Sequence, residues 1–158
     1  MALARILVDG YSLLHKWETL AHGHPRHVET ARDELVEALT HYQDMTGTPI
    51  SVFFDGSSPK GGPRQKARRK EVEILYSHAG QTADQMIERT THRLLPYGEV
   101  LVVTDDHMER DTVIALGGMA VNCGLFIDEF LKLHGVLQRD IENHNLREKR
   151  RFGRARNA

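Results

Sequence analysis

The sequence contains a single cysteine, Cys123, among its 158 residues. One cysteine cannot form an internal disulfide or a cysteine-based zinc site, and this favours a reducing, cytoplasmic location. No apolar run approaches the roughly 20 residues that a membrane-spanning helix needs, so we expect no membrane partner. The short apolar run after Arg5 is typical of a strand rather than of a signal peptide.

Several catalytic motifs are also absent. There is no glycine-rich Walker A loop, and Asp9-Gly10-Tyr11 lacks the second aspartate that a haloacid-dehalogenase-type phosphatase would use. Ser57 and Ser58 lie in a Gly/Ser/Pro-rich stretch without the strand–turn–helix setting of a nucleophile elbow. These absences argue against a Walker A nucleotide-binding protein, a haloacid-dehalogenase-type phosphatase and a hydrolase with a nucleophile elbow.

Net charge is close to zero, at −1, but its distribution along the chain is uneven. Residues 60–70 and 147–158 hold 12 of the 21 basic residues and one of the 22 acidic residues. The rest of the chain therefore has a net charge of about −12. An acidic body with two concentrated basic segments favours a polyanionic partner, although either segment could also be a solvated charge run.

Apolar runs alternate with helical patterns along the chain, which predicts an α/β fold with a mainly parallel five-stranded sheet in a three-layer sandwich. We expect strands at 5–8, 50–54, 71–76, 100–103 and 119–122, and helices at 28–45, 83–95, 107–116 and 127–142. Residues 1–142 are expected to form one domain, followed by a basic tail at 143–158.

Aspartates follow three of the predicted strands. Asp9 and Asp55 end the first two, and Asp105-Asp106 ends the fourth. Carboxyl ends of parallel strands share one edge of the sheet, where ligands bind. Carboxylates gathered there suit Mg²⁺ or Mn²⁺, with Asp55 the weakest candidate because Asp-Gly also begins loops.

Further acids lie on the predicted helices. Thr82 to Gln85 resembles a capping box, which places Asp84 in the first turn of its helix with Glu88 on the same side. Asp105 and Asp106 cannot both point the same way, so we expect one to bind metal and the other to act through water or cap the next helix. We expect Glu109 and Asp111 to be solvated.

The ordered set of motifs resembles the YacP-like subgroup of the NYN domains, a branch of the PIN-like nucleases. Residues 6–14 read Ile-Leu-Val-Asp-Gly-Tyr-Ser-Leu-Leu, and residues 52–56 read Val-Phe-Phe-Asp-Gly. Gln-Thr-Ala-Asp follows at 81–84 and Val-Thr-Asp-Asp at 103–106, in the family's order and at similar spacing. The similarity covers roughly residues 4–130.

The resemblance implies a PIN-like, Rossmann-like sheet and a metal-dependent endoribonuclease that hydrolyses RNA phosphodiesters. The family's metal-binding and catalytic acids fall on Asp9, Asp84 and Asp106, with Asp105 as an additional acid in place of a serine. Ser12 stands where the family usually has asparagine, in a substrate-orienting position. Some relatives cleave mRNA on ribosomes, so the ribosome is a candidate partner. The basic cluster expected to hold the RNA backbone comprises Lys60, Arg64, Lys66, Arg68, Arg69 and Lys70.

Two other functions fit the sequence. A non-catalytic RNA- or ribosome-binding module would keep the fold, and the replacement of asparagine by Ser12 is compatible with it. A metal-dependent phosphatase acting on a small phosphoester would use the same acids and would not need the basic cluster at 60–70.

Overall fold

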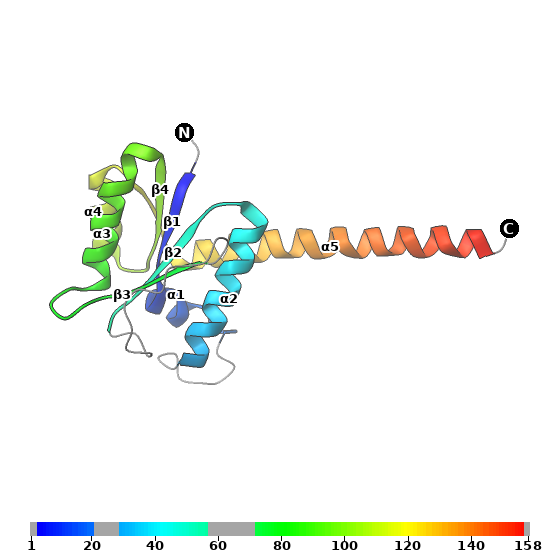
Figure 1. The fold of residues 1–158 in the computed structure, drawn as a ribbon, viewed down its shortest axis with the longest axis horizontal. Helices are drawn as coiled ribbons and strands as arrows, with labels where there is room; N and C mark the ends of the chain where they lie inside the picture. Colours follow the sequence, from blue (N-terminus) through cyan, green and yellow to red (C-terminus); the bar gives the residue numbers. More distant parts are fainter. Residues whose placement is uncertain (1–2, 21–28, 57–71, 157–158) are drawn as a thin grey trace. The chain divides into compact units, whose positions relative to one another are not determined.

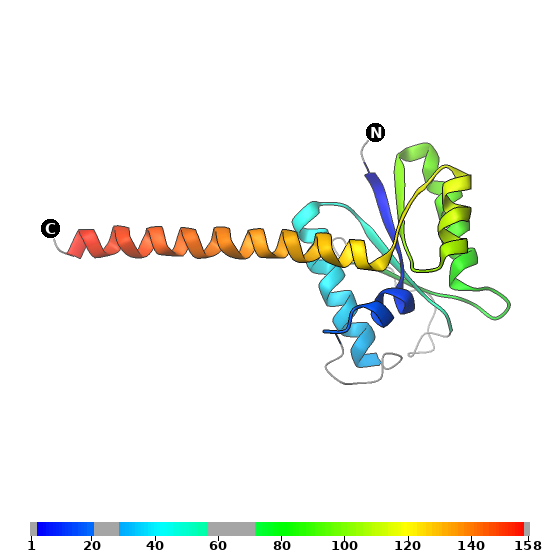
Figure 2. The ribbon, with the colours of Figure 1, turned by 180° about the vertical axis from the view of Figure 1, so that it is seen from behind.

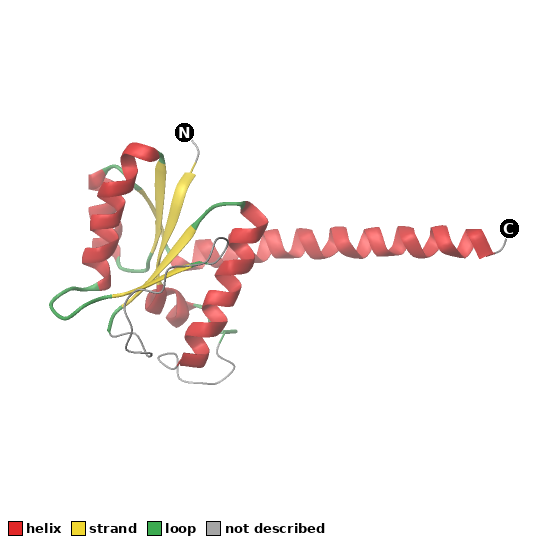
Figure 3. Ribbon diagram, in the orientation of Figure 1, coloured by secondary structure: helices red, strands yellow, loops and turns green. Residues whose placement is uncertain are grey.

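The structure is a computed structural model that describes residues 3–20, 29–56 and 72–156. Its helices and strands alternate along the chain (Figures 1 and 3). They are β1 (Leu3–Asp9), α1 (Gly10–Lys16), α2 (Glu29–Thr46), β2 (Ile50–Phe54), β3 (Glu73–Tyr76), α3 (Ala83–Leu94), the 3₁₀ turn η1 (Leu95–Tyr97), β4 (Glu99–Val103), α4 (His107–Leu116), β5 (Met119–Val121) and α5 (Cys123–Arg156).

The described strands form one sheet in the order β3-β2-β1-β4-β5, and every neighbouring pair is parallel. The order reverses direction beside β1, because the chain first adds β2 and β3 on one side and then β4 and β5 on the other. In open α/β sheets such a switch point marks where ligands bind, outside the carboxyl ends of the strands. Asp9 ends β1 at this point.

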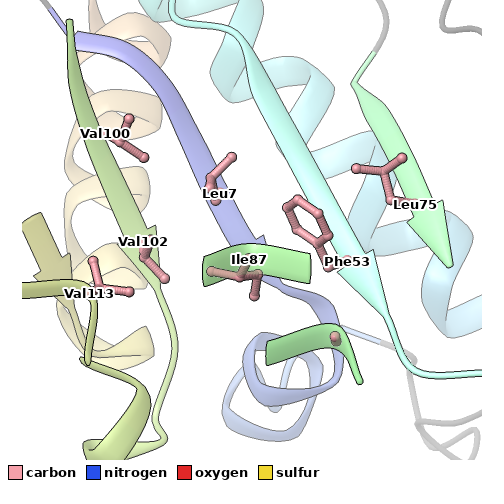
Figure 4. Packing of buried hydrophobic residues seen from close by; sticks show 8 residues of the cluster. Leu7, Phe53, Leu75, Ile87, Val100, Val102 and Val113 are labelled. Atoms are coloured by element: carbon pink, nitrogen blue, oxygen red, sulfur yellow. The ribbon is translucent and has the colours of Figure 1, made fainter. Parts of the chain in front are cut away.

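The sheet is covered on both faces, with α3 and α4 on one side and α1 and α2 on the other (Figures 1 and 2). Ile87 of α3 packs over Leu7, Phe53 and Val102 from the three central strands (Figure 4). Burial on both faces explains why β2 is buried along its whole length and reads as a continuous apolar run. The predicted three-layer α/β sandwich is therefore confirmed.

The chain divides into two compact units, residues 1–126 and 127–158. The first turn of α5 belongs to the first unit, where the Phe126 ring lies 5.1 Å from that of Tyr42 in α2. Within the second unit α5 is an unbroken helix to Arg156 (Figure 2). No helix of the described residues is both long and apolar enough to cross a membrane.

Two features of the secondary structure differ from the sequence prediction. The helix α1 was not predicted, and the helix predicted at 127–142 is wrong at both ends, because α5 runs from Cys123 to Arg156. No break in α5 marks the boundary predicted after residue 142, so the division into domain and tail stays a prediction. The basic residues of 147–156 are helical, in keeping with the good helix propensity of arginine and lysine.

Gly10 allows α1 to begin directly at the end of β1. A Cβ atom at this position would lie only 2.3 Å from the Phe54 ring of β2. We expect Gly10→Ala to lower the free energy of unfolding by about 1–3 kcal/mol, because the buried Phe54 ring would have to shift. Urea unfolding would measure this change.

The matched control is Gly135→Ala in the interior of α5, where nothing lies within 4 Å of the added Cβ. That substitution should be neutral or stabilising, because alanine favours a helix over glycine by roughly 0.5–1 kcal/mol. A Gly10→Ala protein as stable as the wild type would show that the contact between α1 and Phe54 is not tight.

Candidate active site

Four aspartates from separate elements influence one another at the carboxyl edge of the sheet. Asp9 ends β1, Asp55 follows β2, Asp106 follows β4, and Asp84 lies in the first turn of α3. Each of the other three raises the pKa of Asp84 by its negative charge. The convergence predicted from the strand ends is therefore present as an electrostatic cluster.

Asp9 is partly buried, and two hydrogen bonds hold its carboxylate. The backbone N–H of Ser12 donates to Oδ1 at 3.3 Å, and the Thr104 hydroxyl donates to Oδ2 at 3.1 Å. Burial raises the pKa of Asp9, these two bonds oppose the shift, and the charges of Asp55 and Asp106 add to it. The side chain thus has a fixed orientation in a region of negative potential.

Thr104, fully buried just after β4, connects Asp9 to Asp106. Its hydroxyl donates to Asp9 and accepts the backbone N–H of Asp106 at 3.2 Å. A hydroxyl can do both because it has one proton and two lone pairs. Thr104 was not among the residues predicted for the site, although its place between β4 and the paired aspartates was the available signal.

Asp106 caps α4. Its Oδ1 accepts from the backbone N–H groups of Met108 at 3.0 Å and Glu109 at 3.4 Å. Of the two adjacent aspartates, Asp106 is therefore the one that caps the next helix. A carboxylate can do this with one oxygen and keep the other oxygen for a ligand.

Asp84 is half-buried, and its pKa is raised to about 6. Burial is the largest cause, followed by the charges of Asp9, Asp106, Asp55 and Glu88. Both reciprocal bonds of the predicted capping box between Thr82 and Gln85 are present, so the first turn that carries Asp84 is well anchored. A carboxylate held against its neighbours in this way would be stabilised by a bound cation.

Asp55 fixes the start of α3. Its Oδ1 accepts the backbone N–H of Ala83 at 2.6 Å and the Ser77 hydroxyl at 3.4 Å. Ser77 in turn accepts the N–H of Gly56 at 3.0 Å. Asp55 thus holds Ala83, the residue next to Asp84. This contact gives a structural reason for an acid at position 55, which was the weakest candidate in the sequence.

Asp105 and Ser12 face the start of α5. The Asp105 N–H donates to Ser12 Oγ at 2.8 Å, and Asp105 Oδ1 accepts the Cys123 N–H at 2.8 Å. Cys123 Sγ lies 3.7 Å from Ser12 Oγ, and burial raises the pKa of this thiol to about 12. The two residues therefore connect the ends of β1 and β4 with α5.

Glu109 was predicted to be solvated, and this prediction is wrong. The residue is only 4% exposed, and its buried Oε1 atom has no hydrogen-bond partner among the residues that the structure describes. Its pKa is raised to about 9 by burial first, then by a hydrogen bond to Glu88 and by the charges of Asp84, Glu88 and Asp106. Glu109 lies four residues before the buried Val113, so helical spacing was the available signal. Asp111, in contrast, is exposed as predicted, and its Oδ2 atom lies 3.7 Å from Nε2 of His107.

The donor set suits a hard divalent cation, but the site is not a closed cage. Within the described ranges, no three histidine, cysteine or acidic side chains are placed to hold a metal ion by themselves. Mg²⁺ commonly binds through one or two carboxylates and completes its coordination with waters and substrate phosphates. A pair drawn from Asp9, Asp84 and Asp106 fits that mode of binding, with the third carboxylate adding negative charge nearby. The predicted RNA-holding cluster from Lys60 to Lys70 lies outside the described residues.

A family model for the YacP-like NYN domain matches residues 6–156. The chain belongs to this family. The match confirms the resemblance drawn from the motifs and extends it from residue 130 almost to the end of the chain. Membership makes this a nuclease-type domain with an RNA-related function.

Relatives in Bacillus subtilis support the assignment. The chain is 30% identical over 115 residues to the uncharacterized protein YacP of strain 168, a match that covers 72% of this chain and 67% of that protein. Two crystal structures of Rae1 (YacP) from Bacillus subtilis, one of a mutant, match with TM-scores of 0.74 and 0.72 at 24% and 23% identity. These matches cover 88% and 90% of this chain and 81% of each crystal chain, and they establish the fold.

The Glu109 proton makes stability depend on pH. With a folded-state pKa near 9 and an ordinary value of 4.5, the unfolded chain releases this proton as pH rises above about 4.5, while the folded chain retains it. This contribution to stability is present at low pH and is lost progressively up to about pH 9. We expect Glu109→Gln to match the wild type near pH 5 and to exceed it by on the order of a few kcal/mol at pH 8.

Urea unfolding in EDTA at both pH values would measure this difference, because EDTA removes any cation that would charge the cluster. Asp111→Asn on the exposed side of the same helix is the control, and it should not change the pH dependence. A Glu109→Gln protein that is destabilised equally at both pH values would show that Glu109 is ionised in the folded protein.

Proposed function

We propose that the chain is a metal-dependent endoribonuclease that hydrolyses RNA phosphodiesters. The supporting observation is the set of mutually repelling carboxylates of Asp9, Asp84 and Asp106 at the switch point of a YacP-like NYN domain. Their oxygens would hold Mg²⁺ or Mn²⁺. When bound, the cation would promote attack by water and neutralise the charge that develops on the phosphate and the leaving oxygen.

Each side chain then has a role that follows from its contacts. Asp9 and Asp106 present oxygens whose orientation Thr104 and the start of α4 hold fixed. Asp84, with a pKa near 6, is mostly ionised at neutral pH, and a bound cation would further favour its charged form. Asp105 and Ser12 assist by holding the β1 and β4 ends together. Water attack at phosphorus with cleavage of the P–O3′ bond leaves a 5′-phosphate and a 3′-hydroxyl.

The basic cluster at 60–70 would hold the RNA backbone, as predicted from the sequence. Neither the ribosome as partner nor the cytoplasm as location is tested by the structure, and both stay predictions. A phosphatase of small phosphoesters would use the same acids, and an RNA-binding module would need none of them. Cleavage and binding measurements separate these functions.

The decisive experiment is cleavage of an end-labelled single-stranded RNA with Mn²⁺, Mg²⁺ or EDTA. We expect cleavage only with metal, and a loss of at least about 100-fold in Asp84→Asn, because removing one metal-binding carboxylate forfeits several kcal/mol of transition-state stabilisation. The Asn variant should remain folded and be more stable at neutral pH, since it removes one of the mutually repelling charges.

Asp111→Asn again serves as the control, because it removes an exposed acid from α4 without touching the cluster. Full activity of a folded Asp84→Asn protein would remove Asp84 from the site. RNA binding without cleavage under every metal condition would favour the binding module, and turnover of simple phosphomonoesters with intact RNA would favour the phosphatase.

A further inference from the structure

Four arginines form a stripe along one face of α5. Arg147, Arg150, Arg151 and Arg154 occur at spacings of three, four and seven residues from the first, which places them on one side of a helix. The stripe is roughly 10 Å long at 1.5 Å per residue. Glu148, the one acid between 147 and 156, lies about 100° around the helix from Arg147.

Within residues 3–20, 29–56 and 72–156, these arginines form no ion pair with an acid. All four side chains are exposed, and the salt bridges found in the described segments involve none of them. A fixed row of unpaired guanidinium groups is typical of a surface that meets an external anion.

Helix stability alone does not account for the stripe. Basic residues near a helix C-terminus interact favourably with the helix dipole, but the effect fades within the last turn. Arg147 lies nine residues before the end of α5 at Arg156, and the stripe spans two turns. The dipole therefore explains Arg154 at most.

We propose that this arginine stripe binds the phosphate backbone of a folded RNA segment. Guanidinium groups bind phosphate through two parallel hydrogen bonds, and all four residues of the stripe are arginine rather than lysine. A preformed helix presents its charges at fixed spacing, which suits a ligand whose phosphates are also fixed by base pairing. The stripe is a surface separate from the aspartate cluster, and RNA as the anion rests on the proposed function.

The test uses the full chain in EDTA, so that binding is measured without catalysis. Fluorescence anisotropy with a labelled RNA hairpin would compare the wild type with Arg147→Gln/Arg151→Gln/Arg154→Gln. We expect affinity at about 100 mM salt to fall at least ~10-fold, and the slope of log K against log salt to fall by about 2–3, because each lost phosphate contact contributes about 0.9. Glutamine has a helix propensity close to that of arginine, and circular dichroism would verify that α5 is intact.

The matched control is Gln138→Glu/Asn145→Glu/Lys149→Gln, which lowers the net charge by the same three units at exposed positions on the opposite face of α5. It should retain most of the affinity and salt dependence. Equal losses in both triple variants, no loss in either, or binding to phosphatidylglycerol vesicles in place of the hairpin would overturn the proposal. Hairpin binding that depends on the stripe in a protein without cleavage activity would support it and reject only the proposed catalysis.

Discussion

Mutual repulsion among carboxylates at one edge of the sheet is the constraint on which the site depends. The charges of Asp55 and Asp106 raise the pKa values of both Asp9 and Asp84, and Glu109 is buried nearby with a pKa that Asp84 and Asp106 also raise. The fold offsets this repulsion locally in two ways. Backbone N–H groups and the Thr104 hydroxyl neutralise part of the charge, and Glu109 retains its proton. The negative charge that these contacts do not offset favours the binding of a cation.

The topology explains why these acids meet although they are far apart in sequence. Parallel pairing brings the carboxyl ends of β1, β2 and β4 to one edge, and the strand order reverses between β1 and β4, which is where open α/β sheets bind ligands. Asp9 and Asp106 lie on the two sides of that point, and Thr104 bridges them. The hydroxyl of Thr104 therefore fixes the position of the Asp9 carboxylate relative to the backbone of Asp106.

Much of the aspartate cluster could be predicted from local sequence patterns. Acids after apolar runs predict a cluster, because every parallel strand delivers its carboxyl end to the same edge. The opposite directions of Asp105 and Asp106 follow from alternation, but only the structure shows that Asp106 caps α4 and Asp105 accepts from Cys123. The sequence suggested solvent exposure for Glu109 because glutamate is rarely buried, and that statistical preference fails where a proton can be retained.

The two helix errors have different physical causes. α1 is seven residues long, too short for a periodic pattern, and it depends on tertiary contacts at Gly10 and on the Asp9 cap. The end of α5 was missed because a run of charges was taken as a tail, although arginine, lysine and glutamate are good helix formers. For α1 the deciding signal lies in tertiary contacts, whereas for the end of α5 it was already present in the intrinsic helix preference of the charged residues.

The raised pKa values also bear on how a polyanion could reach this site. An arginine or lysine close to the aspartates would lower their pKa values, yet Asp9 and Asp84 are shifted upward and no basic residue is among their causes. Arg110 lies beside the site, but its guanidinium donates to the Thr104 backbone carbonyl at 2.9 Å, and no ion pair between a basic residue and these aspartates is found in the described part of the chain. Affinity for RNA would then come from separate basic surfaces such as the arginine stripe, while charge neutralisation at the acids would come from the cation. Such a division keeps the carboxylates unpaired for the cation and the arginines unpaired for phosphate.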